Sequence, residues 1–267
     1  YDVSYLNVLL GKLIKSKPRL ILFRLKNWQY ILGELKMNAN KLNKLTEIVV
    51  SCKKCPRLIK YIKEVANNKP KRYLKWNYWS KPLPSFGDPD ARLVIVGLAP
   101  AAHGGNRTGR MFTGDSSGDW VIRALYEIGL ANQPTSYSRD DGLILKSTYI
   151  TAAVRCAPPK NKPLSSEIRN CLKYLVWEFH LLKNMKIILA LGRIAFRSTL
   201  WALEEAFNIR IKPRPAFKHH AKYFIKEVPV WIYASYHPSR QNTQTGRLTW
   251  SMWIKVFKDI QQNILSI

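Results

Sequence analysis

From residue 92 onwards, short continuous apolar runs alternate with segments in which apolar residues recur every three or four positions. Runs of the first kind are typical of buried parallel strands, and segments of the second kind are typical of amphipathic helices. Strands are predicted at 92–97, 147–156 and 186–192, with a strand followed by a loop at 228–239. Helices are predicted at 119–131, 165–184, 193–207 and 249–267. This alternation predicts a parallel sheet with helices on both faces.

A basic segment precedes the alternating region. Residues 1–50 carry Leu and Ile at helical spacing with a break at Pro18, whereas 72–91 mixes aromatic residues, lysines and prolines without a period. Residues 1–75 contain 18 Lys or Arg and 4 Asp or Glu, a net charge of +14. Such a segment is either an arm that contacts nucleic acid or a solvated helical face.

The charge of the whole chain limits its partners. The net charge is +27, from 44 Lys and Arg against 17 Asp and Glu. A lysine-rich surface of a heat-adapted protein normally carries as much Glu, so this excess indicates a polyanionic partner, most often nucleic acid. No apolar run reaches the roughly 18 residues that a membrane span needs, and we find no secretory signal with a cleavage site. We therefore expect no membrane partner and a cytoplasmic location.

Polar segments follow three of the predicted strands. The longest, GLAPAAHGGNRTGRMFTGDSSGDW at 97–120, is rich in glycine and offers a histidine, an asparagine, two arginines and two aspartates. A second segment follows Cys156, and SYHPS at 235–239 follows the last strand. Ligands of open parallel sheets bind beyond the carboxyl ends of the strands. We therefore expect these three segments to form one site.

Four cysteines are candidate metal ligands. Cys52 and Cys55 form a CxxC pair, while Cys156 and Cys171 are separated by fourteen residues and arise from a strand end and a helix. Spacing alone leaves three alternatives open, namely an iron–sulfur cluster, a structural zinc ion, and disulfides or free thiols. Zinc ribbons usually pair CxxC with a second CxxC, which this chain lacks.

Three motifs together resemble the uracil-DNA glycosylase superfamily. GLAPAAHGGNRTGRMFTGDSSG, TAAVRCAPPKNKP and SYHPSRQNTQTG occur in the order of that superfamily, and the similarity is greatest to its iron–sulfur branch, family 5 (UDGb). The resemblance implies an α/β fold, a three-layer αβα sandwich with a central, mostly parallel four-stranded sheet. It places this domain at 46–267, after a basic helical extension at 1–45. It also implies that the four cysteines hold a [4Fe-4S] cluster with a structural role.

The resemblance further implies roles in cleaving a base from deoxyribose. Phe112 would stack on the extruded base, and His237 would contact the base oxygen or the nearby phosphate. The superfamily's usual polar residue is replaced by Leu98, so Asp115 would orient the attacking water, with Asn161 as the second polar candidate. The implied catalytic residues are Asp115, Asn161 and His237, and the implied base-binding residues are Gly97, Ala99, His103 and Phe112.

These residues also have structural alternatives. Phe112 could be a core aromatic, and His103 could only fix the loop. Asp115 could cap a helix, although Asp119 could take that position and leave Asp115 free. Asn161 could be a turn residue in a proline-rich loop.

Basic residues near the motifs are expected to contact DNA phosphates, since they lie beside the site in sequence. These residues are Arg107, Arg110, Arg240 and Arg247. Residues 239–247 could enter the minor groove and fill the gap left by an extruded nucleotide, or could form a solvated loop.

The function indicated by this resemblance is a monomeric, monofunctional DNA glycosylase that acts on uracil in double- or single-stranded DNA in a prokaryotic cytoplasm. Because Leu98 replaces a polar residue that discriminates between bases, we also expect other deaminated bases such as hypoxanthine to be removed. The alternative is a nucleic-acid-binding iron–sulfur protein of the same fold without catalysis. A radical or electron-transfer enzyme is disfavoured, because four cysteines leave no open iron site and no further cofactor motif is present.

Overall fold

A computed structural model describes residues 39–265 of the chain. The chain divides into two units after residue 41, and the description below concerns the second, 42–267. Most of the extension expected at 1–45 lies outside the described residues. Leu42 and Leu45 are buried in the core of the second unit, which therefore begins slightly earlier than the expected boundary at 46.

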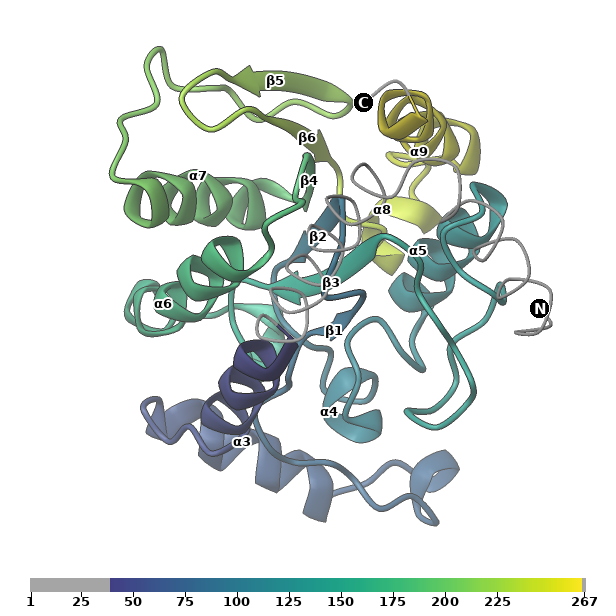
Figure 1. Cartoon of the computed structure of the whole chain (residues 1–267). Coiled ribbons are helices and arrows are strands. Elements are labelled where there is room, and N and C mark those ends of the chain that lie inside the picture. Colours follow the sequence, from purple (N-terminus) through teal and green to yellow (C-terminus); the bar gives the residue numbers. More distant parts are fainter. Residues whose placement is uncertain (1–38, 266–267) are drawn as a thin grey trace, which may run out of the picture. The chain divides into compact units, whose positions relative to one another are not determined.

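A six-stranded sheet forms the centre of this unit (Figure 1). Its strands are β1 (Phe86–Gly87), β2 (Leu93–Gly97), β3 (Thr148–Ala152), β4 (Ile187–Leu191), β5 (Ala221–Ile225) and β6 (Val230–Ser235). They lie in the order β1-β3-β2-β4-β6-β5. The four central strands are mutually parallel, and β1 and β5 pair antiparallel at the two edges.

The four parallel strands confirm the predicted sheet, but the predicted strand count is too low by the two edge strands. Strand β1 has only 2 residues, too few for a periodic signal. Strand β5 alternates between exposed and partly buried positions, so its sequence contains no continuous apolar run. The pattern of apolar runs in the sequence therefore did not reveal either edge strand.

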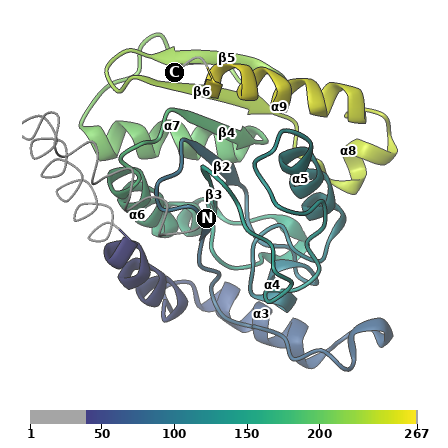
Figure 2. The same cartoon turned by 45° about the vertical axis from the view of Figure 1, so that its right-hand side comes forward.

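Helices cover both faces of the sheet. They are α3 (Pro56–Asn67), α4 (Gly105–Thr108), α5 (Ser116–Glu127), α6 (Ser165–Leu181), α7 (Arg193–Phe207), α8 (Arg240–Gln244) and α9 (Trp250–Leu265), with 3-10 turns η1 (Lys71–Tyr73) and η2 (Pro159–Asn161). Helices α6 and α7 pack on one face, and α5 and α9 pack on the other (Figures 1 and 2). The result is the expected three-layer αβα arrangement.

The core follows from the alternation of side chains along the strands. Within β2, Val94 and Val96 join the cluster beneath α6 and α7, whereas Leu93 and Ile95 join the cluster beneath α5 and α9. All five residues of β2 are buried, as expected of a strand covered on both faces. Within residues 39–265, no helix combines the length and the apolar character needed to cross a membrane.

A third cluster lies beside the sheet. It joins the helical residues 42–50, helix α3, the segment after β3 and helix α6, through buried side chains such as Leu58, Ile62 and Ile168. The cysteines belong to this cluster, which therefore connects segments that are far apart in the sequence.

Candidate active site

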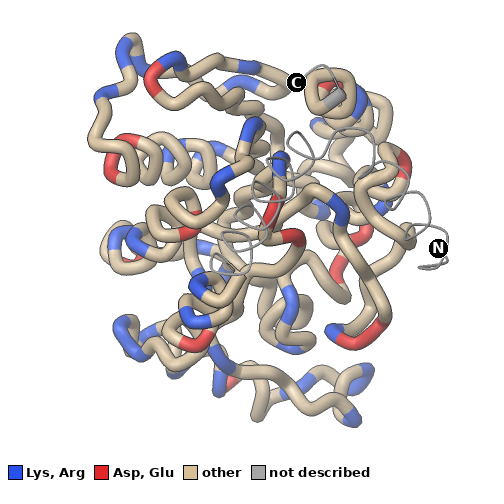
Figure 3. Tube along the Cα trace, viewed as in Figure 1, with Lys and Arg blue, Asp and Glu red and all other residues tan. Residues whose placement is uncertain are grey.

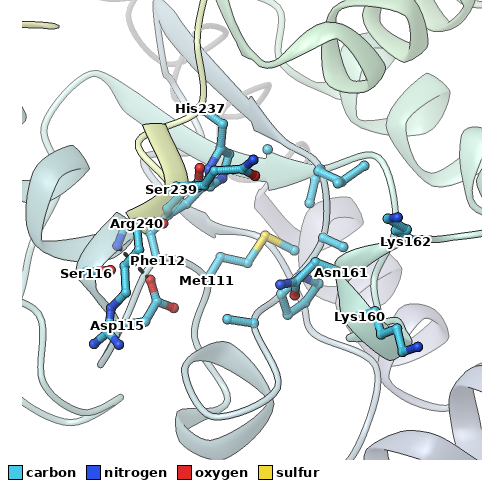
Figure 4. Close-up of a pocket in the computed structure, with 18 residues that line it drawn as sticks. Met111, Phe112, Asp115, Ser116, Lys160, Asn161, Lys162, His237, Ser239 and Arg240 are labelled. Atoms are coloured by element: carbon cyan, nitrogen blue, oxygen red, sulfur yellow. Dashed lines mark hydrogen bonds between the residues drawn. The ribbon is translucent and has the colours of Figure 1, made fainter. Parts of the chain in front are cut away.

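A pocket of about 600 Å³ opens at the carboxyl ends of the parallel strands (Figure 4). Three segments line it: residues 97–117 after β2, residues 152–162 at and after β3, and residues 237–241 after β6. The structure therefore brings together the three motifs that the sequence placed at strand ends. The lining residues with functional side chains are Met111, Phe112, Asp115, Ser117, Lys160, Asn161, Lys162, His237, Ser239, Arg240 and Gln241.

Phe112 lies at the floor of the pocket beside the end of β2. A side chain at Gly97 would place its Cβ 3.0 Å from the Phe112 ring, so the ring would have to shift by a few tenths of an ångström to admit one. The ring is half-buried and stacks with the His237 imidazole, with centroids 6.1 Å apart and an interplanar angle of 30°. Phe112 also has a φ of 49°, a left-handed conformation that is unusual for an aromatic residue. Backbone strain of this kind is concentrated at functional sites.

Asp115 begins α5 and lines the pocket. Its Oδ1 atom accepts hydrogen bonds from the amides of Ser117 and Gly118, both at 3.0 Å, so Asp115 is the N-cap of the helix. The expectation that Asp119 would cap this helix is wrong, since Asp119 lies one turn further on and is exposed. Capping and a second role are nevertheless compatible, because Oδ2 has no hydrogen-bond partner among the described residues.

The surroundings of Asp115 favour the protonated form. Burial raises the pKa of this carboxyl above its ordinary value, and the amides of Gly118 and Ser117 lower it only in part. Oδ2 lies against Gly104, where an added Cβ would be 1.9 Å from the oxygen. The glycine-rich loop thus folds tightly around the one carboxylate that lines the pocket.

His237 follows β6 and faces the same pocket. Burial lowers the pKa of its imidazole to about 4, so the ring is neutral at physiological pH. Its carbonyl accepts a hydrogen bond of 2.8 Å from Nδ2 of Asn242, and Ser117 Oγ donates to the neighbouring carbonyl of Pro238 at 3.0 Å. These bonds fix the histidine segment to the loop after β2.

Asn161 belongs to a tight turn at the pocket rim. Lys160 and Asn161 have φ values of 53° and 55°, both left-handed, and both side chains are exposed. The turn explanation for Asn161 is therefore correct, and the same turn places Asn161 at the pocket. The sequence analysis missed the flanking residues Lys160 and Lys162, although their positions on either side of Asn161 were visible in the motif.

Two expected phosphate contacts are corrected by the structure. Arg107 and Arg110 are only 4% and 6% exposed. Arg107 donates to the carbonyls of His103 and Gly114, and Arg110 forms an ion pair of 2.8 Å with Asp141. Both guanidinium groups are thus used inside the fold and are not available to a phosphate.

His103 is also placed away from the pocket lining. Its Nδ1 lies 3.0 Å from the hydroxyl of Tyr78, and its ring packs near Tyr73. The structure therefore supports the alternative in which this histidine fixes the loop. By contrast, Arg240 and Arg247 are exposed, with Arg240 at the rim and Arg247 over the Tyr236 ring at 4.8 Å.

The four cysteines are brought together in the third core cluster. None of the four forms a disulfide in this structure, and Cys55, Cys156 and Cys171 are buried. Burial, followed by the neighbouring cysteines, raises the pKa of the Cys156 thiol. Asn170 Nδ2 donates to Cys55 Sγ at 3.4 Å. Among residues 39–265, no group of three or more His, Cys, Asp or Glu side chains has an arrangement that could hold a metal ion.

Comparison with known proteins relates this geometry to a family. Residues 84–261 match the family described as the uracil DNA glycosylase superfamily. A type-5 uracil-DNA glycosylase of Pyrobaculum aerophilum is 48% identical over 202 residues, which are 75% of this chain and 84% of the relative. A type-5 enzyme of Thermus thermophilus is 46% identical over 216 residues, 81% of this chain and 95% of the relative. A type-4 uracil-DNA glycosylase of Sulfurisphaera tokodaii is 28% identical over 201 residues, 75% of each chain.

Proposed function

The chain belongs to the uracil DNA glycosylase superfamily, and on this basis we propose that it removes uracil from DNA by hydrolysing the N-glycosidic bond. The observation that carries the proposal is one pocket that combines an aromatic ring, a carboxylate with an unpaired oxygen and a neutral histidine. The strongly basic chain suits a DNA partner, either double- or single-stranded. Such an enzyme would act on the DNA of a prokaryotic cytoplasm and needs no second subunit.

Base capture is assigned to the floor and walls of the pocket. A base extruded from the stack would lie against Phe112, since flipped bases are held between aromatic and apolar groups. The neutral ring of His237 supplies a hydrogen-bond donor for a base oxygen, and it places no positive charge inside the pocket. Gly97 and Ala99 form a wall with no polar side chain, which allows close approach of the base.

Hydrolysis is assigned to Asp115. Oδ1 is held by two amides, so the side chain has a fixed orientation, and Oδ2 is left for a water molecule. An ionised carboxylate at this place would orient the water and stabilise the positive charge that develops on the sugar. Asn161 at the rim is the second polar group that could position this water.

We propose that the pocket also accepts other deaminated bases, hypoxanthine among them. Leu98 and Ala99 lie at the start of the loop and line the pocket. A site rejects a base when binding would leave a buried polar side chain of the site unpaired, and neither residue has a polar side chain. The chemistry should end at the abasic site. Lys160 and Lys162 are both exposed to water, whereas desolvation is one of the means by which an amine nucleophile loses its proton.

We further propose that Cys52, Cys55, Cys156 and Cys171 hold a [4Fe-4S] cluster. The support is the family resemblance together with the chemistry of the four thiols, since thiolates are the usual ligands of such clusters and these four come from three segments of one apolar cluster. Among the described residues the thiols are not arranged around a metal-sized site, so the cluster requires them to move closer together. The Asn170 bond to Cys55 is the kind of contact that tunes a ligating sulfur. The proposed role is structural, because these cysteines connect residues 42–55, the segment after β3 and helix α6.

Excision is tested with an end-labelled duplex that contains one uracil. The wild-type protein is expected to give a strand break only after alkali, because the immediate product is an abasic site. A break without alkali, or a product trapped by borohydride, would contradict monofunctional hydrolysis. Binding without any cleavage would favour the non-catalytic alternative. Duplexes containing hypoxanthine test the wider substrate range.

The cluster is tested on protein purified without oxygen. Iron and sulfide are expected in equal amounts, about four of each per chain, together with a yellow-brown colour. One zinc ion per colourless chain would contradict the proposal. Cys171→Ser is expected to lower the iron content and the thermal midpoint before it affects cleavage per folded molecule.

A further inference from the structure

His219 contacts the segment that carries His237, although it lies outside the three motifs and does not line the pocket. Its Nδ1 atom accepts a hydrogen bond of 3.3 Å from the amide of Tyr236 and lies 3.2 Å from the hydroxyl of Ser235. Its ring also stacks on the Tyr236 ring, with centroids 5.0 Å apart and an interplanar angle of 18°. One side chain therefore holds the two residues that directly precede His237.

The contact with the Tyr236 amide defines the protonation state of the His219 ring. An amide can only donate, so Nδ1 presents a lone pair and the proton of the neutral ring is on Nε2. Burial lowers the pKa of this imidazole and the adjacent His220 lowers it further, while a hydrogen bond with the main chain of Met252 opposes them in part. At neutral pH the ring is therefore an uncharged acceptor.

The charges around His219 do not favour a protonated ring. Residues 218–235, which form β5, β6 and their connections, contain three lysines and one acid, Glu227 (Figure 3). Asp259 of α9 lies 3.3 Å from Nε2 of the neighbouring His220. Among the described residues, no carboxylate forms a hydrogen bond or an ion pair with His219 itself. The histidine thus has no anionic partner that would stabilise its charged form.

The chain on the other side of His237 is fixed independently. The carbonyl of His237 accepts two bonds of 2.8 Å, one from Nδ2 of Asn242 and one from the amide of Ser239. These bonds hold the chain after the imidazole, whereas His219 holds the chain before it. With both ends fixed, the His237 ring keeps its place beside Phe112 in the pocket (Figure 4).

We propose that His219 is a positioning residue of the active site, which holds the amide of Tyr236 and thereby orients the His237 ring towards the base. The inference rests on the proposed function, since it assumes that His237 contacts a base in the pocket. His219 does not line the pocket, so it acts on the reaction only through His237. The acceptor atom of His219, and not the bulk of its ring, carries the effect.

Two substitutions separate the acceptor from the ring. The side-chain oxygen of His219→Asn can accept in place of Nδ1, whereas His219→Phe keeps a ring that can stack on Tyr236 and has no acceptor. We expect His219→Phe to lower kcat/KM for a uracil-containing duplex about tenfold, as loss of one hydrogen bond would, and His219→Asn to recover most of this loss. Affinity for a duplex without uracil should be unchanged, because phosphate contacts dominate it. The proposal is overturned if His219→Phe cleaves like the wild type, or if His219→Asn is the slower of the two variants.

A double-mutant cycle tests whether the effect passes through His237. If it does, His219→Phe should cause no further loss in a protein that already carries His237→Ala, because no imidazole is left to orient. A loss of equal size in both backgrounds would contradict the proposal. His180→Phe is the matched control, since His180 is exposed on α6 and its ring packs 5.6 Å from that of Phe207. This control should cleave like the wild type, and a control that loses as much activity as His219→Phe would also contradict the proposal.

One measurement needs neither DNA nor cleavage. Nitrogen spectra of protein with isotope-labelled histidine should show the proton of the wild-type His219 ring on Nε2. The ring signals of His237 should shift in His219→Phe and stay in place in His180→Phe. A proton on Nδ1 of His219 would overturn the proposal even if the phenylalanine variant fails to fold. A protein that gives the expected spectra but leaves uracil in place contradicts only the proposed excision, whereas normal excision without the coupling contradicts only the role of His219.

Discussion

The Oδ2 atom of Asp115 lies against the Cα of Gly104, so that a methyl group on Gly104 would come within 1.9 Å of this oxygen. The two residues are eleven positions apart on one loop, and their contact fixes the unbonded side of the carboxylate. No other amino acid at 104 allows that carboxylate to keep its place.

Replacing Gly104 with alanine should therefore displace Asp115. We expect Gly104→Ala to lower the single-turnover cleavage rate by about two orders of magnitude, because one positioned stabilising group is lost. Affinity for DNA should change little. Gly129→Ala is the control, since Gly129 has a φ of +77° and no neighbour within 4 Å, so it costs stability without moving the site. Equal cleavage by Gly104→Ala and wild type would show that the contact has no catalytic consequence.

Asp115→Asn should separate stability from activity. The amide oxygen of Asn still caps α5, and the substitution removes a carboxylate whose pKa is raised by burial. A raised native pKa means that ionisation costs stability as the pH rises through it, so at pH 7 the variant should be at least as stable as wild type in urea unfolding. Its single-turnover cleavage should fall by about 10² to 10³. A variant that cleaves normally would move the water-positioning role to Asn161.

The pH dependence of cleavage should reflect the same carboxyl. If the ionised form is active, the rate should increase with pH through an apparent pKa above that of an ordinary aspartate, because burial raises the pKa of Asp115. Histidine should add no step near neutrality, since the His237 pKa is about 4. Single-turnover rates between pH 4 and pH 9 measure this profile. A step near pH 6.5 that disappears in His237→Asn would contradict a neutral histidine.

His237 itself is expected to act as a neutral hydrogen-bonding group. Both His237→Asn and His237→Ala remove the ring that stacks with Phe112, but His237→Asn keeps a neutral donor and should therefore retain more activity than His237→Ala. The expected difference is about 1 kcal/mol in kcat/KM, the net contribution of a typical hydrogen bond. Identical rates for the two variants would remove the hydrogen bond from the mechanism.

Arg107 should prove to be a residue that holds the loop. Its guanidinium lies 4.0 Å from the centre of the Trp76 ring and 4.3 Å from that of Tyr73, and it also binds the carbonyl of Gly114. Lysine cannot reproduce a planar group between two rings, so Arg107→Lys should cost about 1–3 kcal/mol of stability. Urea unfolding measures this loss. In Arg107→Gln, which removes the charge, the salt dependence of DNA binding should stay unchanged, because the guanidinium is used inside the fold. A flatter salt dependence would restore the phosphate role that we have withdrawn.

The sequence predicted those features that repeat along the chain. The run Leu93–Gly97 is apolar throughout, and such a run is typical of a strand that is buried on both faces, so the parallel strands and the sites at their ends could be located. Strand β5 could not be located in this way, because its exposed face breaks the pattern.

Individual side chains in the glycine-rich loop were less predictable. Arg110 is basic and lies two residues from Phe112, which suggested a phosphate contact. Its partner Asp141 is 31 residues away in the chain, and only the folded structure shows that the two side chains meet. The sequence indicated that Asp115 could cap a helix. Only the structure shows that Oδ1 alone makes the capping bonds and that Oδ2 is left without a partner among the described residues.

The roles proposed for the two oxygens of Asp115, one in capping and one in catalysis, restrict how this position can change over generations. Glutamate would keep the negative charge, but its longer side chain would not reach the amides of Ser117 and Gly118 in the same way. Serine and asparagine would keep the cap and lose the charge. A lineage that abandons catalysis can therefore drift at this site without unfolding, whereas a lineage that retains catalysis has one acceptable residue.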